Sequence, residues 1–441
     1  MNVISESDWW GFKRNAWHEG GIHVKTAFSW ADDYFMRGKT VRRTTCCPPL
    51  LLVLCVVLIL QACNDRTTQI SSVSTQNHGV SAALLQGSND WPMFGYNSAH
   101  TGHVDQSAHP RQAKGSIVWS RKFSPVFSSS VAGLGMLYVA STDGRLYALK
   151  QNTGTVRWSV KLGDYLTDTT PALQGQVLFV AVHSTALEAL DIHTGQPYWT
   201  FETDEKIQSP PLVKNGRVLL ASRTSLWMLD AASGSLLWKF HHGADGWPTT
   251  GSPTIAGNAV YVGLGSGTQL WALNLADGHV LWSFDTGDRI MSTAIVGNEM
   301  IYVATWHGTV VALNWHTGQR LWSYSLNTTH MRSMIDGIGG NMAFADGRLY
   351  VGDYRGEVLC IDALHGNLIW RYATGAQVLA TPIVVTDHIY IGSGDGIFYA
   401  LDTRTGRPVW HYTTGEIRAS ACWANNHLYI GSLSGMMYAF N

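Results

Sequence analysis

The side chains best suited to chemistry gather in two polar stretches of the sequence. The candidate residues in them are His241, His242, Asp245, Trp247, His330, Arg332 and Asp336. Adjacent histidines near an aspartate are metal-ligand types, but their spacing does not match a compact zinc site, so a solvated polar loop is favoured over a metal site. Tryptophan and arginine are enriched at the hot spots of protein interfaces. Both stretches are therefore candidate contacts for a partner.

A third feature, the cysteine of Leu60-Gln61-Ala62-Cys63, could be modified covalently. It follows an apolar run from Leu50 to Leu60 that a basic cluster precedes, which is typical of a secretory signal peptide. The run is too short for a spanning helix, which needs about 20 residues. The last four residues resemble a bacterial lipobox, in which the cysteine thiol is acylated and becomes the mature N-terminus. We expect a lipid on Cys63; the alternatives are ordinary cleavage nearby and an uncleaved anchor, because Gln61 is unusual in this pattern.

These signals divide the chain into four parts. The segment before the signal is interpreted as a non-native extension, with Met36 as an alternative to Met1 for the true start. The stretch after Cys63 is rich in Ser, Thr, Gln and Asn and lacks periodicity, which is typical of a disordered tether. The predicted parts are residues 1–35 (extension), 36–62 (signal peptide of lipoprotein type), 63–90 (tether) and 91–441 (folded body).

The folded body is built from an internal repeat that ends in a tryptophan. Seven glycines, each followed four residues later by Trp, recur at spacings of 39 to 48 residues. Glycine suits a left-handed turn between two strands, and a tryptophan after it is large enough to cover the gap between neighbouring sheets. The tryptophans expected in this role are Trp119, Trp158, Trp199, Trp238, Trp282, Trp322, Trp370 and Trp410.

The strand count predicts an all-β fold, an eight-bladed β-propeller of four-stranded antiparallel blades. A pattern of three strands occurs eight times, and the last copy runs from Ala419 to Asn441, where the chain stops without a fourth strand. Ile117-Val118-Trp119 has the pattern of that missing strand. We therefore expect the N- and C-terminal strands to share the last blade, which closes the ring and removes exposed sheet edges.

Two of the repeats are longer than the others, and the extra residues are the two polar stretches described above. Insertions in propellers go to loops, where binding residues concentrate. Both insertions connect the outermost strand of one blade to the innermost strand of the next. We expect both to open on the same rim of the ring.

The unit Ala-x-Asp-x-x-Thr-Gly-x-x-x-Trp, as in residues 400–410, resembles the PQQ-like β-propeller repeat family, and the resemblance covers about residues 91–441. Residues 90–94 with Asn97 and His100-Thr101-Gly102 also resemble a lead-in segment of its bacterial members. The family contains PQQ-dependent dehydrogenases, the outer-membrane assembly lipoprotein BamB and many exported proteins of unassigned role. The resemblance thus implies the fold, but it narrows the function only in part.

Composition and resemblance together favour a binding scaffold over an enzyme. A net charge of −1 offers nothing to attract nucleic acid, and the 18 histidines are scattered singly apart from His241-His242. Family dehydrogenases commonly hold their quinone beside a vicinal disulfide, whereas the vicinal pair here, Cys46-Cys47, falls in the signal. Cys360 and Cys422 in the folded body are expected to be separate buried thiols rather than a disulfide.

We therefore expect a monomeric, exported propeller, lipid-anchored to the cell membrane or outer membrane and facing the periplasm or exterior. It would bind a protein or peptide partner, possess no catalytic residues and require neither a cofactor nor a metal. The alternative is a PQQ-dependent dehydrogenase that oxidises alcohols or sugars with PQQ and Ca²⁺. The sequence does not name the ligand, the partner or the membrane.

Overall fold

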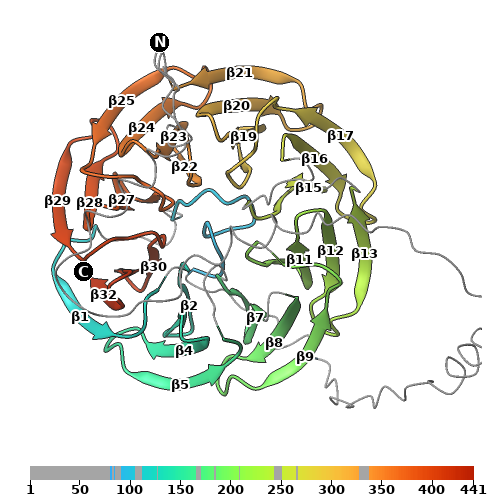
Figure 1. The fold of residues 1–441 in the computed structure, drawn as a ribbon, viewed down its shortest axis with the longest axis vertical. Coiled ribbons are helices and arrows are strands. Elements are labelled where there is room, and N and C mark those ends of the chain that lie inside the picture. The colour runs from blue at the N-terminus through green and yellow to red at the C-terminus, as the bar shows by residue number, and fades with distance from the viewer. Residues whose placement is uncertain are drawn as a thin grey trace, which may run out of the picture. The chain divides into compact units, whose positions relative to one another are not determined.

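The repeats form a closed ring of eight antiparallel sheets (Figure 1). A computed structural model describes residues 80–81, 84, 91–104, 112–126, 128–164, 170–182, 185–207, 209–242, 251–264, 267–326 and 337–441. The chain separates into two units, residues 1–72 and 73–441, and the ring belongs to the second. The predictions for the N-terminal extension, the signal peptide and Cys63 lie outside the described residues.

Each blade is a meander of four strands, named A to D from the centre outwards. Blades 1 and 2 consist of β2 (Val131–Gly133), β3 (Met136–Ala140), β4 (Arg145–Lys150), β5 (Val156–Lys161), β6 (Ala172–Gln174), β7 (Val177–Val182), β8 (Ala186–Asp191) and β9 (Pro197–Glu202). Blades 3 and 4 consist of β10 (Leu212–Lys214), β11 (Arg217–Ala221), β12 (Ser225–Asp230), β13 (Leu236–His241), β14 (Thr254–Ala256), β15 (Ala259–Leu264), β16 (Gln269–Asn274) and β17 (Val280–Asp285).

The second half of the ring repeats this arrangement. Blades 5 and 6 consist of β18 (Ile295–Gly297), β19 (Met300–Ala304), β20 (Thr309–Asn314), β21 (Arg320–Ser325), β22 (Met342–Ala345), β23 (Arg348–Gly352), β24 (Glu357–Asp362) and β25 (Leu368–Ala373). Blades 7 and 8 consist of β26 (Ile383–Val385), β27 (His388–Gly392), β28 (Ile397–Asp402), β29 (Pro408–Thr413), β30 (Cys422–Ala424), β31 (His427–Gly431), β32 (Met436–Phe440) and β1 (Ile117–Lys122).

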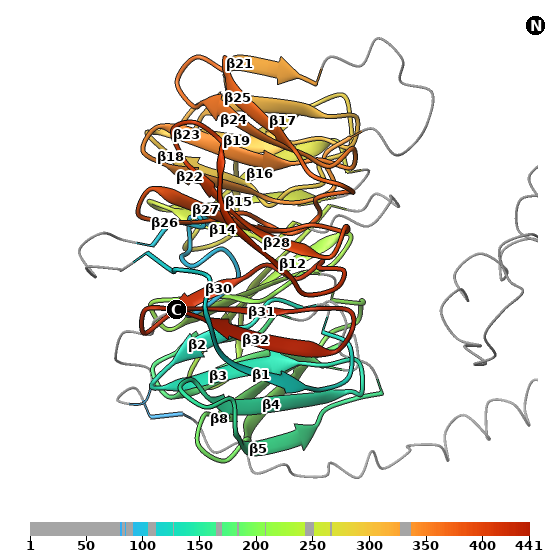
Figure 2. The same ribbon diagram turned by 90° about the vertical axis from the view of Figure 1, so that its left-hand side faces the viewer.

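The predicted closure of the ring is confirmed. The N-terminal strand β1 is the outermost strand of blade 8 and pairs antiparallel with the C-terminal strand β32, with Trp119 opposite Ala439. Figure 2 shows the two strands side by side next to the C-terminus. The backbone N–H of Lys114 also donates to the carbonyl of Asn441, 2.5 Å away. The outer edge of β32 is therefore covered by a strand from the other end of the chain, and blade 8 has four strands like the other blades.

Burial follows the position of a strand within its blade. Inner strands such as β7 bury every residue, because neighbouring blades cover both of their faces. Outer strands such as β17 alternate exposed and half-buried residues, as expected where one face meets solvent. Cys360 and Cys422 are separate buried thiols, as expected. Within the described part of the chain, no helix has the length and apolar character needed to span a bilayer.

Each repeat tryptophan joins its blade to the next one. In all eight blades its indole Nε1 donates at 2.7 to 3.3 Å to a backbone carbonyl in or beside the next blade's C–D turn, a position that the segment before β1 takes for Trp410. The indole also lies on the glycine of that turn, where an added Cβ would come within 2.5 to 2.9 Å of the ring. These glycines are Gly115, Gly154, Gly195, Gly234, Gly278, Gly318, Gly366 and Gly406, and each has a positive φ.

Residues 91–104, which we call the lead-in segment, cross the centre of the ring (Figure 1). They form backbone hydrogen bonds with the innermost strands of six blades, at Ala132, Leu173, Ile255, Val296, Phe344 and Val384. His100 is buried, and its ring nitrogens lie 2.8 and 2.9 Å from the carbonyl oxygens of Phe94 and Pro253. The lead-in segment therefore ties blades together from the inside, as the tryptophans do further out.

Candidate functional site

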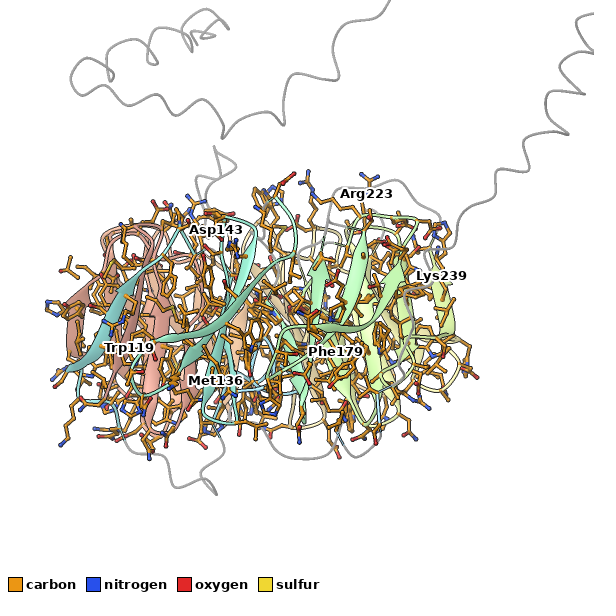
Figure 3. All side chains as sticks on the ribbon, turned by 90° about the horizontal axis from the view of Figure 1, so that it is seen from below. Trp119, Met136, Asp143, Phe179, Arg223 and Lys239 are labelled. Atoms are coloured by element: carbon orange, nitrogen blue, oxygen red, sulfur yellow. The ribbon has the colours of Figure 1, made fainter. Side chains whose placement is uncertain are left out.

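The strand order gives the ring two distinct faces. The B–C hairpins and D–A connections open on one face, here called the loop face, and the A–B hairpins and C–D turns open on the opposite one, the turn face. Figure 3 shows Asp143 and Arg223, both in B–C hairpins, at the same edge of the ring, with Met136 nearer the other edge. The two enlarged connections follow β13 and β21 and lead into β14 and β22. Both are D–A connections and belong to the loop face.

Two of the seven candidate residues fall within the described structure, His241 at the end of β13 and His242 directly after it. The other five, Asp245, Trp247, His330, Arg332 and Asp336, lie outside the described residues. The His241 side chain is 54% exposed, and its Nδ1 lies 2.9 Å from Ser225 Oγ and 3.7 Å from Glu205 Oε1. It therefore stands beside a carboxylate that sequence reasoning did not select.

Glu205 is the centre of a hydrogen-bonded cluster on blade 3. Its carboxylate accepts from the hydroxyls of Ser222, Thr224 and Ser225 at 2.5 to 2.6 Å. Partial burial by itself would raise the pKa of Glu205, but the three hydroxyl donors outweigh it and hold the pKa at about 2. The loop face of blade 3 thus carries a negative charge that persists at any physiological pH.

The His242 ring packs against Trp271, with centroids 4.8 Å apart, and its backbone N–H donates to the carbonyl of Thr224. Within the described residues, neither Nδ1 of His242 nor Nε1 of Trp271 has a hydrogen-bond partner, although both atoms are buried. A buried polar atom left without a partner costs about 1 to 3 kcal/mol. A binding partner that forms hydrogen bonds with these two atoms would therefore gain binding free energy at this corner of the loop face.

A second corner of the loop face lies between blades 5 and 6. Trp306 and Tyr354 are half-buried and make an edge-to-face contact, with centroids 5.6 Å apart. The hairpin of Trp306 is fixed by His307, whose Nδ1 lies 2.7 Å from Asp288 Oδ1. Amphipathic aromatic rings and exposed basic residues such as Arg355 are types that dominate binding energy at protein interfaces.

Asp353, at the base of the Tyr354 hairpin, is fully buried. One carboxylate oxygen accepts the backbone N–H of Glu357 at 2.7 Å, and the other has no partner among the described residues. Burial raises the pKa of Asp353 to about 6. The equivalent position in five other blades carries a hydroxyl residue, namely Ser141, Ser222, Thr305, Ser393 and Ser432. That departure from the repeat was the sequence signal that could have singled out Asp353.

The described part of the chain brings together no group of three or more His, Cys, Asp or Glu side chains that could hold a metal ion. The loop face carries the Glu205 carboxylate, which three hydroxyls hold in place, and the Trp306–Tyr354 ring pair. It also contains buried polar atoms of His242 and Trp271 that have no hydrogen-bond partner among the described residues. Such groups are suited to binding another molecule through hydrogen bonds and ring contacts.

A protein-family model described as "Outer membrane protein assembly factor BamB" matches residues 102–169, 164–289, 222–335 and 307–441. The chain belongs to this family of PQQ-like propeller repeats. BamB of Moranella endobia is 26% identical over 279 residues, which cover 58% of this chain. Across the first two BamB relatives, the aligned region spans 55 to 69% of their own length. Quinone-dependent alcohol dehydrogenases match over 19 to 40% of the chain.

Solved structures share the propeller fold with this BamB-family chain. BamB from Moraxella catarrhalis superposes with a TM-score of 0.61 at 18% identity, covering 74% of this chain and 99% of that one. A quinohemoprotein alcohol dehydrogenase from Pseudomonas putida superposes with a TM-score of 0.68 at 14% identity, covering 81% of each. At these identities the likeness establishes the fold, and function has to be argued from the site.

Proposed function

We propose that this BamB-family propeller is a non-catalytic binding scaffold of the cell envelope, which holds a protein partner on its loop face during outer-membrane protein assembly. Family membership supports this proposal, as do the names of the BamB relatives, which are outer-membrane protein assembly factors. A lipid on Cys63 would keep the ring at a membrane. The dehydrogenase alternative rests on shorter sequence matches.

One observation carries the choice of face. Both enlarged connections open on the loop face, and each adjoins a described corner with binding character: the Glu205–His241 cluster at the first and the Trp306–Tyr354 pair at the second. Lys239 in the first corner is already paired with Asp204 at 2.9 Å and lies over the Trp227 ring. The loop face thus combines preorganised charge with aromatic surface, which reduces the entropy lost on binding.

Site-specific photocrosslinking tests the assignment of this face. A photoreactive residue placed at Tyr354 in the full chain, expressed in bacterial envelopes, should give a discrete crosslinked adduct that contains an outer-membrane assembly protein. The matched control places the same residue at Asn426, an exposed position in an A–B hairpin of the turn face. Equal adducts from both positions, or none from Tyr354, would refute the proposed binding face.

Two further measurements test the rest of the proposal. Cys63→Ser should move the protein from the membrane fraction to the soluble fraction without changing its circular dichroism spectrum. Purified protein supplied with PQQ and Ca²⁺ should give no dye-linked oxidation of alcohols or sugars. Quinone-dependent turnover would overturn the non-catalytic assignment, and an unchanged membrane fraction would overturn the lipid.

A further inference from the structure

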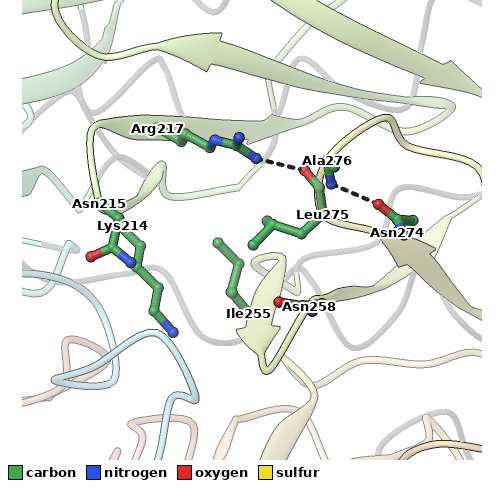
Figure 4. Close-up of a pocket in the computed structure, with 8 residues that line it drawn as sticks. All are labelled: Lys214, Asn215, Arg217, Ile255, Asn258, Asn274, Leu275 and Ala276. Atoms are coloured by element: carbon green, nitrogen blue, oxygen red, sulfur yellow. Dashed lines mark hydrogen bonds between the residues drawn. The ribbon is translucent and has the colours of Figure 1, made fainter.

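A pocket of about 440 Å³ opens on the turn face between blades 3 and 4 (Figure 4). The A–B hairpin of blade 3 forms one wall, and the A–B hairpin and C–D turn of blade 4 form the other. The pocket lies away from the loop face, and its volume falls in the range of small-molecule sites. Its lining residues are Lys214, Asn215, Arg217, Ile255, Asn258, Asn274, Leu275 and Ala276.

Blade 3, which forms one wall of the pocket, departs from the repeat in its strand B. Seven blades carry an aromatic residue in strand B that packs on the blade's own tryptophan, as Tyr138 on Trp158, Phe179 on Trp199, Tyr261 on Trp282, Tyr302 on Trp322, Tyr350 on Trp370, Tyr390 on Trp410 and Tyr429 on Trp119. Blade 3 carries Leu219 at this position. Blade 3 thus lacks the ring that the other seven blades place on their tryptophan, and the carbonyl that accepts from Trp238 belongs to Leu275, a lining residue.

The pocket wall contains an arginine that shares a carbonyl acceptor with the repeat tryptophan. In blades 1 and 4 the tyrosine hydroxyl donates to the carbonyl that receives the tryptophan Nε1, at 3.3 Å for Tyr138 and 3.0 Å for Tyr261. In blade 3 the corresponding carbonyl belongs to Leu275, and the guanidinium of Arg217 donates to it at 3.0 Å (Figure 4). Blade 6 has the same contact, because Arg348 donates to the Thr403 carbonyl at 3.4 Å beside Tyr350, so the position of Arg217 does not depend on Leu219.

The lining is positively charged and rich in amide groups. Lys214 is half-buried and has neither a hydrogen bond nor an ion pair among the described residues, and this partial burial lowers the pKa of its ammonium. Asn274 accepts the Ala276 backbone N–H through Oδ1, which leaves its Nδ2 free to donate. The eight lining residues include no carboxylate. An anionic oxygen group placed here would meet a point charge, the remaining N–H groups of a guanidinium and amide donors.

We propose that this pocket binds a small polar molecule bearing one anionic oxygen group, a phosphate or a carboxylate, with Lys214 and Arg217 as its charge partners. The observation that carries it is the half-buried Lys214, which no described carboxylate pairs with, beside Arg217 in a pocket whose lining includes no carboxylate. This binding is independent of the partner proposed for the loop face.

Isothermal titration calorimetry of the purified full chain at low ionic strength tests the site with three probes: glucose 6-phosphate, gluconate and uncharged glucose. We expect at least one of the two anions to bind saturably, with a Kd of about 0.1 to 1 mM, and glucose not to bind. The two anion arms distinguish a phosphate source from a carboxylate source. Lys214→Met should weaken binding at least about tenfold, the scale of one charge-assisted contact.

A filling variant separates binding from folding. In Leu219→Tyr the new hydroxyl should engage the Arg217 guanidinium, as Tyr350 engages Arg348 in blade 6, and weaken binding about tenfold or more, with a melting temperature equal to or above that of the parent. The matched control is Lys150→Met, an exposed lysine on the turn face of blade 1, which should change Kd less than twofold. Saturation by neither anion, equal binding of glucose, or equal weakening by Lys150→Met and Lys214→Met would overturn the proposal.

Discussion

The indole nitrogen of Trp410 donates to the carbonyl oxygen of Ala113 at 2.9 Å, although the two residues are 297 positions apart in the chain. The same bond joins every other pair of neighbouring blades over 32 to 41 positions. Besides the pairing of β1 with β32, ring closure therefore relies on an ordinary contact between blades. That contact forms here across a much longer segment, which raises its loop-closure cost by about 2 kcal/mol.

Deleting residues 437–441 should abolish cooperative folding. The deletion removes most of β32 and with it the pairing that holds β1, including the buried Met437, Ala439 and Phe440. We expect the variant to lose a sharp thermal transition in circular dichroism. Val118→Ala, which trims an exposed side chain on β1, is the control and should change stability by no more than about 0.5 kcal/mol. A cooperative transition near the parent temperature in the deletion variant would show that the shared blade is dispensable.

Alanine substitutions at two glycines with the same backbone conformation distinguish the cost of backbone strain from the cost of a steric clash. Gly406 has a φ of +70° and Gly347 a φ of +71°, but an added Cβ would lie 2.5 Å from Trp370 at Gly406 and would meet nothing within 4 Å at Gly347. Alanine at either position carries the left-handed cost of about 1 to 2 kcal/mol. Gly406→Ala should lose a further 1 to 3 kcal/mol, roughly, through overpacking. Urea unfolding of both variants measures the difference, and equal losses would mean that the indole moves aside freely.

The fold followed from the sequence because one local unit repeats. Glycine, tryptophan and alternating strands obey short-range rules, and eight copies of the unit fix the blade number. Val80 is a residue that these short-range rules did not predict correctly. It lies in the stretch predicted as a disordered tether, but it is buried and its N–H donates to the carbonyl of Ala232. That contact depends on a residue 152 positions away, which no local pattern reports.

The candidate binding residues were harder to predict than the fold, because several of them occupy positions where one blade differs from the others. Asp353 replaces a hydroxyl residue, and Leu219 replaces an aromatic one. Both could have been seen by comparing blades position by position. What could not be seen is how they are buried, because the burial of Asp353 and of Leu219 depends on how neighbouring blades pack. Glu205 was not singled out by comparing the repeats. Its fixed negative charge depends on hydroxyls of β12 and of the hairpin before it, which donate to its carboxylate.

The lead-in segment should contribute strongly to stability. It buries Trp91, Met93, Phe94 and Val104 at the centre of the ring, and a buried side chain of this kind is worth about 1.5 to 3 kcal/mol. A chain that begins at residue 105 should therefore lose more than about 5 kcal/mol relative to one that begins at residue 80. Guanidinium unfolding followed by tryptophan fluorescence measures this. Equal midpoints for the two chains would mean that the segment lies in the ring without stabilising it.

Asp353 should make the propeller less stable as the pH rises. Its pKa is raised from 3.8 to about 6 in the folded chain, so the folded state binds more protons than the unfolded state between these two values. Stability from the protonated carboxyl is complete below about pH 4 and is lost as the pH passes 6. A shift of roughly two units corresponds to about 3 kcal/mol.

Asp353→Ser restores the hydroxyl that five other blades carry and isolates this effect from other titrating groups. The variant should gain stability over the parent by about 2.5 kcal/mol more at pH 7.5 than at pH 4, measured by urea unfolding at both values. Glu205 moves stability the other way, because its lowered pKa of about 2 favours the folded state above pH 4.5, but it is present in both chains and cancels. Parallel pH profiles for parent and variant would mean that Asp353 is ionised in the fold and paired with a group beyond the described residues.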